Sequence, residues 1–255
     1  MALEVVFDER FEGDALDTSR WLPYYLPQWS SRERAAARYT VGGGELRLRI
    51  DAGQQPWCPE WDGELRVSSL QTGVFSGPLG SDRGQQRFNP EAVVREAQEP
   101  RALYLQYHGR IQIRFKALAD PRAMVALWMV GFEDEPEKSG EICVAEIFGR
   151  DVVEGESAAV GMGIHPVGDP GLHEEFGREP LEIDVREFHV YAAEWTPDGV
   201  AFFVDGEHVK SVSQSPAYPM QLMLGVYEFP DWPGDDGAGH PKEFVVDSVR
   251  GSRLT

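Results

Sequence analysis

The sequence predicts an all-β sandwich, and three features of the chain support this fold class. Short runs rich in Val, Ile, Phe, Tyr and Trp recur along the 255 residues, and these residue types favour strands. Clusters of Gly, Pro and Asp separate the runs at regular spacing, which is typical of sandwiches. Helical signals are weak. The chain is 42% hydrophobic and can bury a sizeable core. No linker divides it, so we expect a single domain over residues 1–255.

Each expected strand is a run of β-branched, aromatic or aliphatic residues that ends at a turn signal. In chain order we expect strands at 3–7, 45–51, 63–71, 104–118, 123–130, 141–148, 158–164, 188–196, 199–204, 220–226 and 243–252. The dipeptide Asp205-Gly206 predicts a tight hairpin. The Pro-Asp-Gly turn at 196–199 predicts a second hairpin directly before it.

Other parts of the chain carry weaker signals. Residues 90–99 lie between two prolines and are the candidate for a short surface helix. The stretches 77–100 and 167–180 are expected to be loops. Loops of this length in a compact domain are commonly functional, and the first of them has the length to close one end of a cleft.

The charge of the chain limits the classes of binding partner, and its cysteine content bears on whether it forms a disulfide. The net charge of -19 argues against nucleic acid and against anionic membranes, because both attract Lys and Arg. No apolar run is long enough to span a bilayer, and we expect a monomer. No signal peptide precedes the first strand-like run, so we expect a cytoplasmic protein or one whose leader was removed. With a large core available a disulfide is not needed, so Cys58 and Cys143 are expected to be free thiols.

The run 141–148 carries the most specific chemistry. Its Ile, Val and Phe residues indicate a buried strand, yet it contains Glu141 and Glu146. Two carboxylates on one strand face are the equipment of a glycosidase, one as nucleophile and one as general acid and base. Residues five apart on a regular strand point to opposite faces. If the two acids act together, the strand must contain a one-residue β-bulge near Val144 and Ala145.

The motif Glu141-x-Cys143-x-x-Glu146 resembles the Glu-x-Asp-x-x-Glu motif of laminarinase-like members of glycoside hydrolase family 16. Weaker matches follow in the family's order at 8–17, 44–48, 107–114, 127–129, 188–195, 204–206 and 246–250. The resemblance implies a β-jelly-roll sandwich of two curved antiparallel sheets with a cleft on the concave face. It also implies a retaining endo-β-glycosidase acting on polysaccharide, with laminarin-like β-1,3-glucan as the default substrate.

The resemblance assigns roles to the two acids. Glu141 is the expected nucleophile, and Glu146 the expected acid/base of a double displacement, with no cofactor needed for catalysis. Such carboxyl groups lie about 5–5.5 Å apart in retaining enzymes. Mutual repulsion and apolar neighbours should raise the pKa of Glu146.

Cys143 departs from the motif, in which the aspartate hydrogen-bonds the nucleophile. A thiol is a weak hydrogen-bonding group, and its neutrality should ease ionisation of Glu141. The departure keeps a rival interpretation open, a catalytically impaired carbohydrate-binding protein on the same fold. A transglycosylase is a further alternative because it shares the covalent intermediate, and a structural sandwich without a sugar site is a third class. Replacing Cys143 by Asp would separate a decayed enzyme from a thiol-adapted one.

Four residues are candidates for substrate binding. The resemblance places Trp128 beside the acids and Trp232 in a loop at the cleft, and sugar rings stack on aromatic faces. It places His165 next to the acid/base. Arg38 stands where laminarinase-like members have an Asn that contacts the sugar, and arginine binds carboxylate or sulfate. An anionic polysaccharide is one interpretation of Arg38; pairing with one of the chain's many acids is the other.

Some members of the family hold a structural Ca²⁺ ion away from the cleft. The resemblance places Glu9, Gly44 and Asp247 at the ligand positions, and oxygen ligands suit Ca²⁺. We therefore expect these three residues to form a calcium site.

Overall fold

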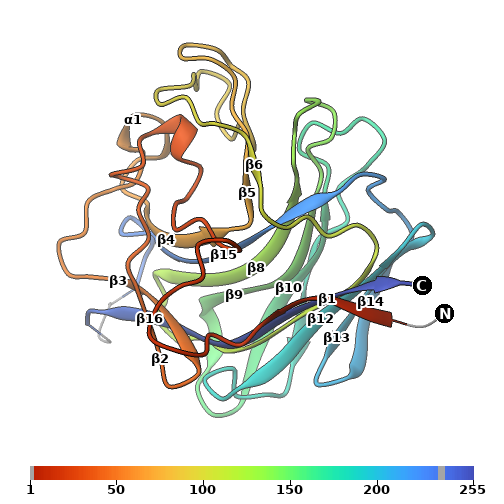
Figure 1. Cartoon of the computed structure of the whole chain (residues 1–255). Coiled ribbons are helices and arrows are strands. Elements are labelled where there is room, and N and C mark those ends of the chain that lie inside the picture. Colours follow the sequence, from red (N-terminus) through yellow and green to blue (C-terminus); the bar gives the residue numbers. More distant parts are fainter. Residues whose placement is uncertain (1–2, 235–238) are drawn as a thin grey trace.

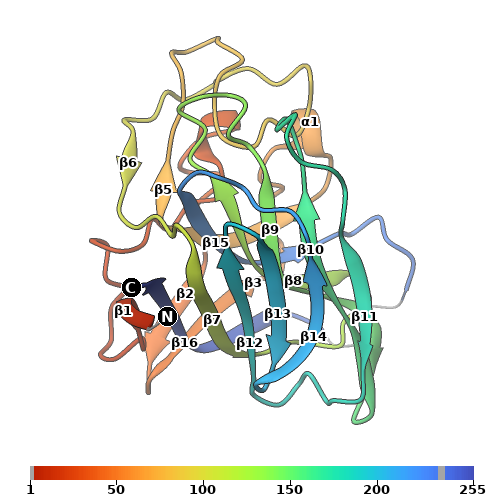
Figure 2. The ribbon, with the colours of Figure 1, turned by 90° about the vertical axis from the view of Figure 1, so that its right-hand side faces the viewer.

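The computed structural model describes residues 3–234 and 239–255, and these residues form a sandwich of two antiparallel β-sheets (Figure 1). The eight-stranded sheet of this part of the chain has the order β14-β13-β12-β7-β16-β3-β2, with β1 also paired to β16. The six-stranded sheet has the order β11-β10-β9-β8-β15-β4, and β5 pairs with β6 apart from both. Strands β1 and β16 bring the two termini side by side (Figures 1 and 2).

The bounds of the described elements follow the predicted strands closely at most positions. They are β1 Leu3–Glu9, η1 Pro27–Trp29, β2 Tyr39–Gly42, β3 Glu45–Ile50, α1 Pro59–Asp62, β4 Arg66–Gln71, β5 Gly73–Val74, β6 Arg101–Ala102, β7 Gly109–Lys116, β8 Ala123–Gly131, β9 Glu141–Val153, β10 Ser157–His165, β11 Gly177–Leu181, β12 His189–Thr196, β13 Gly199–Val204, β14 Glu207–Val212, β15 Met220–Glu228 and β16 Lys242–Leu254. Both predicted hairpins are confirmed, as the β12–β13 and β13–β14 pairs.

Three predictions about local structure were wrong. The stretch 167–180, expected to be a loop, ends in strand β11 from Gly177 onward, because its backbone pairs with β10. Strand β7 does not begin at residue 104, because His108 and Gly109 have positive φ angles of 50° and 96° and break the extended chain. Residues 90–99 form no helix. Ala92 and Val94 are buried while their neighbours are more exposed, so this segment follows the two-residue period of an extended chain. Its Val94 N–H bonds to Ser81 instead of closing a helical turn.

The space between the sheets is filled by one large apolar cluster. It takes residues from both inner faces, including Leu46, Phe115, Leu127, Ile147 and Phe202. The predicted core tryptophans Trp21 and Trp195 are 0% and 1% exposed and belong to it. Both predicted free cysteines are confirmed. No helix of the described residues is long and apolar enough to cross a membrane.

A second apolar cluster lies on the outer face of the six-stranded sheet. Trp128, Cys143 and Met223 rise from the sheet and meet Trp29 and Trp57 from the loops above it. These loops, with α1, gather on the side of the sheet that faces away from the other sheet (Figure 1). The six-stranded sheet is therefore buried on both faces at one end, and the covering loops form the walls of the site described below.

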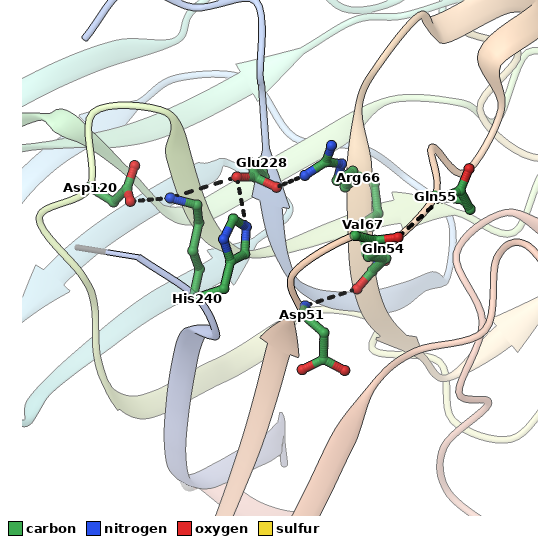
Figure 3. Close-up of polar contacts among 10 residues, drawn as sticks. Asp51, Gln54, Gln55, Arg66, Val67, Asp120, Glu228 and His240 are labelled. Atoms are coloured by element: carbon green, nitrogen blue, oxygen red, sulfur yellow. Dashed lines mark hydrogen bonds and ion pairs between the residues drawn. The ribbon is translucent and has the colours of Figure 1, made fainter. Parts of the chain in front are cut away.

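A buried network of charges fixes the ends of the chain segment that leads from β15 to β16. Glu228 Oε2 accepts a 3.0 Å bond from Arg66, and its Oε1 lies 3.1 Å from His240 Nε2 (Figure 3). The Lys242 ammonium lies 3.6 Å from Glu228 and is hydrogen-bonded to Asp120. Lys242 and Asp120 have side chains that are 0% exposed. The network thereby anchors both ends of the loop that carries Trp232.

Candidate active site

A β-bulge in β9 brings the two acids to the same side of the sheet. Leu127 and Trp128 are neighbours on β8, but they pair with Ala145 and Cys143 on β9, so Val144 is the extra residue. The register on β10 shifts at the same place. Val144 and Ala145 consequently both face the inner core. The bulge predicted near Val144 and Ala145 is confirmed, and it places the side chains before and after it on one face.

Both acids line one cavity of about 250 Å³ on the outer face of the six-stranded sheet. Its walls come from β8, β9 and β15, from the end of α1, and from the loops that carry Tyr25, Leu65, Gln86 and Phe229. The lining residues are Tyr25, Asp62, Leu65, Gln86, Phe88, Met124, Trp128, Glu141, Glu146, Tyr227 and Phe229. A cavity with many aromatic rings and a few convergent polar groups is the ordinary form of a ligand site, and sugar rings have the apolar C–H faces that stack on such rings.

Glu141 is held by the long loop that precedes β6. Its side chain is buried, and its Oε1 accepts a 2.7 Å hydrogen bond from Gln86 Nε2. The Gln86 backbone N–H in turn donates a 2.5 Å bond to Glu133 Oε1. Residue Phe88 of the same loop lines the cavity. The loop 77–100 thus reaches the two candidate catalytic acids, in agreement with its predicted place at the cleft.

Glu146 has a different set of neighbours. The Cys143 thiol lies 3.5 Å from Glu146 Oε1 and donates to it, so the thiol contacts the acid/base candidate and not Glu141. His165 and Arg178 also act on Glu146 through their positive charge. Opposite Cys143, Gly163 has a φ angle of 143°, and a Cβ atom there would collide with the backbone of Glu175.

Burial dominates the titration of the site. Burial first and the nearby charge of Glu146 second raise the pKa of Glu141 to about 8, although the Gln86 amide acts in the opposite direction. Burial likewise raises the pKa of Glu146, against the lowering effects of His165 and the Cys143 thiol. The predicted rise for Glu146 is confirmed, but repulsion acts mainly on Glu141. The two carboxyls titrate as a pair that holds one proton over a range of pH, and burial raises the pKa of Cys143 far enough to keep its thiol neutral.

The structure places Trp128 and His165 beside the acids. Trp128 pairs with Cys143 across β8 and β9, lines the cavity, and is 4% exposed. Its indole N–H lies 3.4 Å from the Tyr227 hydroxyl. His165 is the register partner of Glu141 and holds Glu174 with its Nδ1 at 2.8 Å. Their contacts to substrate stay predictions.

Trp232 lies at the rim of the cavity, in a stack of rings. It lies parallel to Phe229, a cavity residue, with ring centroids 3.8 Å apart. Two further groups contact the Trp232 ring. The Arg150 guanidinium lies 4.0 Å from its centroid, and the centroid of the Phe148 ring lies 5.8 Å from it. Phe148 and Arg150 follow Glu146 at two-residue steps on β9 and share its face. This ring stack extends the aromatic surface beyond the acids.

Arg38 is not brought to the cavity. Its guanidinium forms a 3.0 Å ion pair with Asp51, and its backbone N–H donates to Ser68. This is the arrangement expected of an arginine paired with one of the chain's acids. The structure therefore gives no support to a role for Arg38 in binding anionic sugars.

Two of the three residues expected to hold calcium have their carboxylates bonded to protein partners. Glu9 accepts hydrogen bonds from the Phe11 backbone N–H and from Trp21 Nε1. Asp247 forms a 2.7 Å ion pair with Arg114. Within the described ranges no group of three or more His, Cys, Asp or Glu side chains is placed to hold a metal. As arranged, Glu9, Gly44 and Asp247 do not fit a Ca²⁺ ion, and the calcium site stays a prediction.

Sequence reasoning missed several residues of the cavity. Gln86 lies in a loop whose path no local pattern reveals. Asp62 accepts a 2.7 Å bond from Trp57 Nε1, and burial raises the pKa of Asp62. Tyr227 occupies the outward face of β15, where alternation with the core residue Val226 is the signal that would have found it.

The sandwich, the bulged strand and the paired acids are the arrangement typical of glycoside hydrolases with a β-jelly-roll fold. The model of the glycosyl hydrolases family 16 matches residues 101–249, more than half of the chain. The chain belongs to glycoside hydrolase family 16.

Three known proteins illustrate the relationship. Glucan endo-1,3-beta-glucosidase A1 of Niallia circulans is 25% identical over 226 residues, which cover 85% of this chain and 30% of that protein. A solved structure, the GlcNAcα1-4Gal releasing endo-β-galactosidase from Clostridium perfringens, superposes with a TM-score of 0.85 at 27% identity, over 98% of this chain and 62% of that one. The laminarinase from Rhodothermus marinus gives a TM-score of 0.68 at 20% identity, covering 100% and 98%. The chain thus spans about a third of the curated relative and under two thirds of the first structure.

Proposed function

We propose that this protein is a retaining endo-β-glycosidase that works by double displacement. Glu141 forms a bond to the anomeric carbon as the glycosidic C–O bond breaks, and Glu146 gives its proton to the leaving oxygen. Glu146 then takes a proton from water, whose oxygen attacks the anomeric carbon and releases Glu141. The bulge at Val144 carries this proposal, because it gives both acids access to one cavity.

The shape of the site supports cleavage within a chain. A second hollow of about 490 Å³ is lined by residues of the loop 77–100, by Glu133, Pro136 and Ser139, and by Val167 and Gly168. It adjoins the catalytic cavity at the contact between Glu133 and Gln86, since each hollow is lined by one of the two. On the other side the cavity continues to the rings of Phe229 and Trp232. Binding space on both sides of the acids suits an internal linkage.

For the substrate we favour a glycan with an internal β-galactosidic linkage. The support is the closeness of the match to the endo-β-galactosidase, with a TM-score of 0.85 against 0.68 for the laminarinase at nearly equal coverage of this chain. Two proteins that share a scaffold so closely are candidates for a shared substrate class, although loops on a common scaffold set the final specificity.

β-1,3-Glucan is the second candidate. The relative from Niallia circulans, a glucan endo-1,3-beta-glucosidase, supports it at 25% identity over most of this chain. Laminarin-like β-1,3-glucan, the default substrate predicted from the sequence, is therefore included in the hydrolysis test as the second candidate after β-galactosides.

The first test is hydrolysis of a panel of β-galactoside glycans, agarose, carrageenan, laminarin and mixed-linkage glucan, with Glu141→Gln and Glu146→Gln as controls. Both variants should fold and lose activity. Azide then separates the roles on an activated aryl glycoside of the substrate found. The variant Glu141→Ala should yield the α-glycosyl azide in one displacement, and Glu146→Ala the β-glycosyl azide through the covalent intermediate. Retained hydrolysis in either glutamine variant would contradict the proposal.

The rival interpretations predict other results from the same material. A carbohydrate-binding protein with an impaired site would bind a glycan of the panel and release no reducing ends. A transglycosylase would show transfer to an added oligosaccharide in excess of hydrolysis. The structure favours the enzyme in one respect, because Cys143 leaves the positions of Glu141 and Glu146 in the cavity intact.

A further inference from the structure

Gln86 makes the most direct polar contact to the candidate nucleophile. Its Nε2 donates to Glu141 Oε1 at 2.7 Å. Gln86 is not glycine, yet its φ angle is 48°, in the left-handed region. Such a conformation persists only where surrounding contacts hold it, and the 2.5 Å bond from its own N–H to Glu133 is one of them. The backbone is thus fixed in an unfavourable conformation that turns the amide toward Glu141.

The nitrogen and the oxygen of the Gln86 side-chain amide differ in their hydrogen bonding. The end that faces Glu141 is hydrogen-bonded, while Oε1 is buried without a partner among the described atoms. Buried polar atoms are nearly always satisfied, so an exception needs a reason. A glutamine that only tied the loop to the sheet would be expected to satisfy both ends. Here the amide nitrogen, and not the oxygen, is the atom that faces Glu141. This suits an ionised carboxylate, which accepts hydrogen bonds and cannot donate them.

The other contacts in the site work in the opposite direction. The Cys143 thiol donates to Glu146, and the charges of His165 and Arg178 also favour an ionised Glu146. These three groups would leave the shared proton on Glu141, where it blocks attack. Gln86 is the hydrogen-bond donor that favours ionised Glu141.

We propose that Gln86 is a positioning residue, whose amide orients Glu141 and favours its ionised form against the burial that favours its protonated form. The loop 77–100 thereby supplies to the nucleophile the contact that position 143 gives instead to the acid/base. This inference rests on the proposed function, in which Glu141 attacks and Glu146 protonates.

Several titratable groups surround Glu141, and none of them replaces Gln86. They are Glu146 and Cys143 on its own strand, His165 and Glu174 from β10 and the segment after it, Glu133 from the β8–β9 connection, and the tyrosines Tyr25 and Tyr227. The carboxylates among them repel a negative charge on Glu141. The Gln86 amide is therefore the group whose removal should move the protonation of Glu141 most clearly.

The test is the pH profile of kcat/KM in Gln86→Met, which keeps the length of the side chain and removes the donor. The acid limb reports protonation of the nucleophile. Because the donor lowers the pKa of Glu141, its loss should move this limb to higher pH by about one unit, which is roughly a tenfold loss of kcat/KM below the limb. KM should change little. Gln86→Glu, which keeps the shape and adds a repelling charge, should move the limb in the same direction and serves if the methionine variant does not fold.

Gln98→Met is the matched control, since Gln98 lies in the same loop and bonds to Arg32 and Glu96, away from the acids. Its acid limb should stay in place. An unmoved limb in Gln86→Met, or one moved to lower pH, would overturn the inference while Glu141→Gln remained inactive. Activity retained by Glu141→Gln would instead overturn the proposed function itself.

Discussion

Lys242 offers a sharp test of the forces that hold the cleft loops. Its ammonium and the Asp120 carboxylate are both 0% exposed and bonded to each other. Glu228, 3.6 Å from Lys242, has a further cationic partner in Arg66 and a hydrogen-bonding partner in His240. Lys242→Met would therefore leave Glu228 partly compensated, while Asp120 would lose the cation that neutralises it.

The size of the effect follows from that asymmetry. Removing one partner of a buried ion pair leaves an uncompensated charge and costs about 3–5 kcal/mol of folding free energy. At this chain length roughly 2–4 °C of melting temperature correspond to each kcal/mol. Lys242→Met should therefore melt roughly 6–20 °C below the wild type. Lys242→Met combined with Asp120→Asn removes both charges and should recover about 2–3 kcal/mol of the loss.

Thermal and denaturant unfolding of the four proteins in this double-mutant cycle measures the coupling. Lys138→Met is the control, because Lys138 forms an exposed ion pair with Glu135, and surface pairs contribute little. The control should melt with the wild type. The reasoning would be refuted if Lys242→Met were as stable as the control, or if the double variant were as unstable as the sum of the two single ones.

Two further predictions concern the cleft. Trp232→Ala removes the ring that stacks on Phe229 and under Arg150; it should raise KM roughly two- to tenfold with kcat unchanged, and a fall in kcat alone would speak against a binding role. Cys143→Ala removes a donor that lowers the pKa of Glu146. The pKa of Glu146 should then rise, so the basic limb of kcat/KM, where the acid loses its proton, should move to higher pH; a shift to lower pH would contradict the assigned contact.

The catalytic strand was predictable because two independent periodicities conflict in it. Ile142 and Val144 set an inward face, and Ile147 requires the same face three residues later. Only an extra residue reconciles these positions with a common side for the acids. The central strands β8 and β15 of the six-stranded sheet were likewise predictable, since burial on both faces leaves them strongly apolar.

The strands that the sequence did not reveal are mostly at the edges of sheets. Strands β2 and β11 are terminal in the strand orders. β11 has the sequence Gly-Arg-Glu-Pro-Leu, with no residue in the buried class. Edge strands have one free side and need neither an apolar face nor an unbroken row of N–H donors, so their local signal is weak.

The electrostatics of the site depend on contacts that are distant in sequence. Gln86 and Glu141 are separated by 55 residues and Lys242 and Asp120 by 122. No local pattern specifies these pairs. The motif alone suggested that a neutral Cys143 would ease the ionisation of Glu141, whereas burial raises the pKa of that residue to about 8. The effect of burial outweighs the loss of one neighbouring charge.

The central claim is that Glu141 forms the covalent bond to the sugar. It is tested most directly by incubating the protein with an activated 2-deoxy-2-fluoro glycoside of the oligosaccharide it cleaves, followed by peptide mass mapping. The account predicts one added glycosyl group on the peptide that contains Glu141, located at that side chain by fragmentation and absent from Glu141→Gln. A label on Glu146 or on any other residue, or steady turnover of the natural substrate with no label, would contradict it.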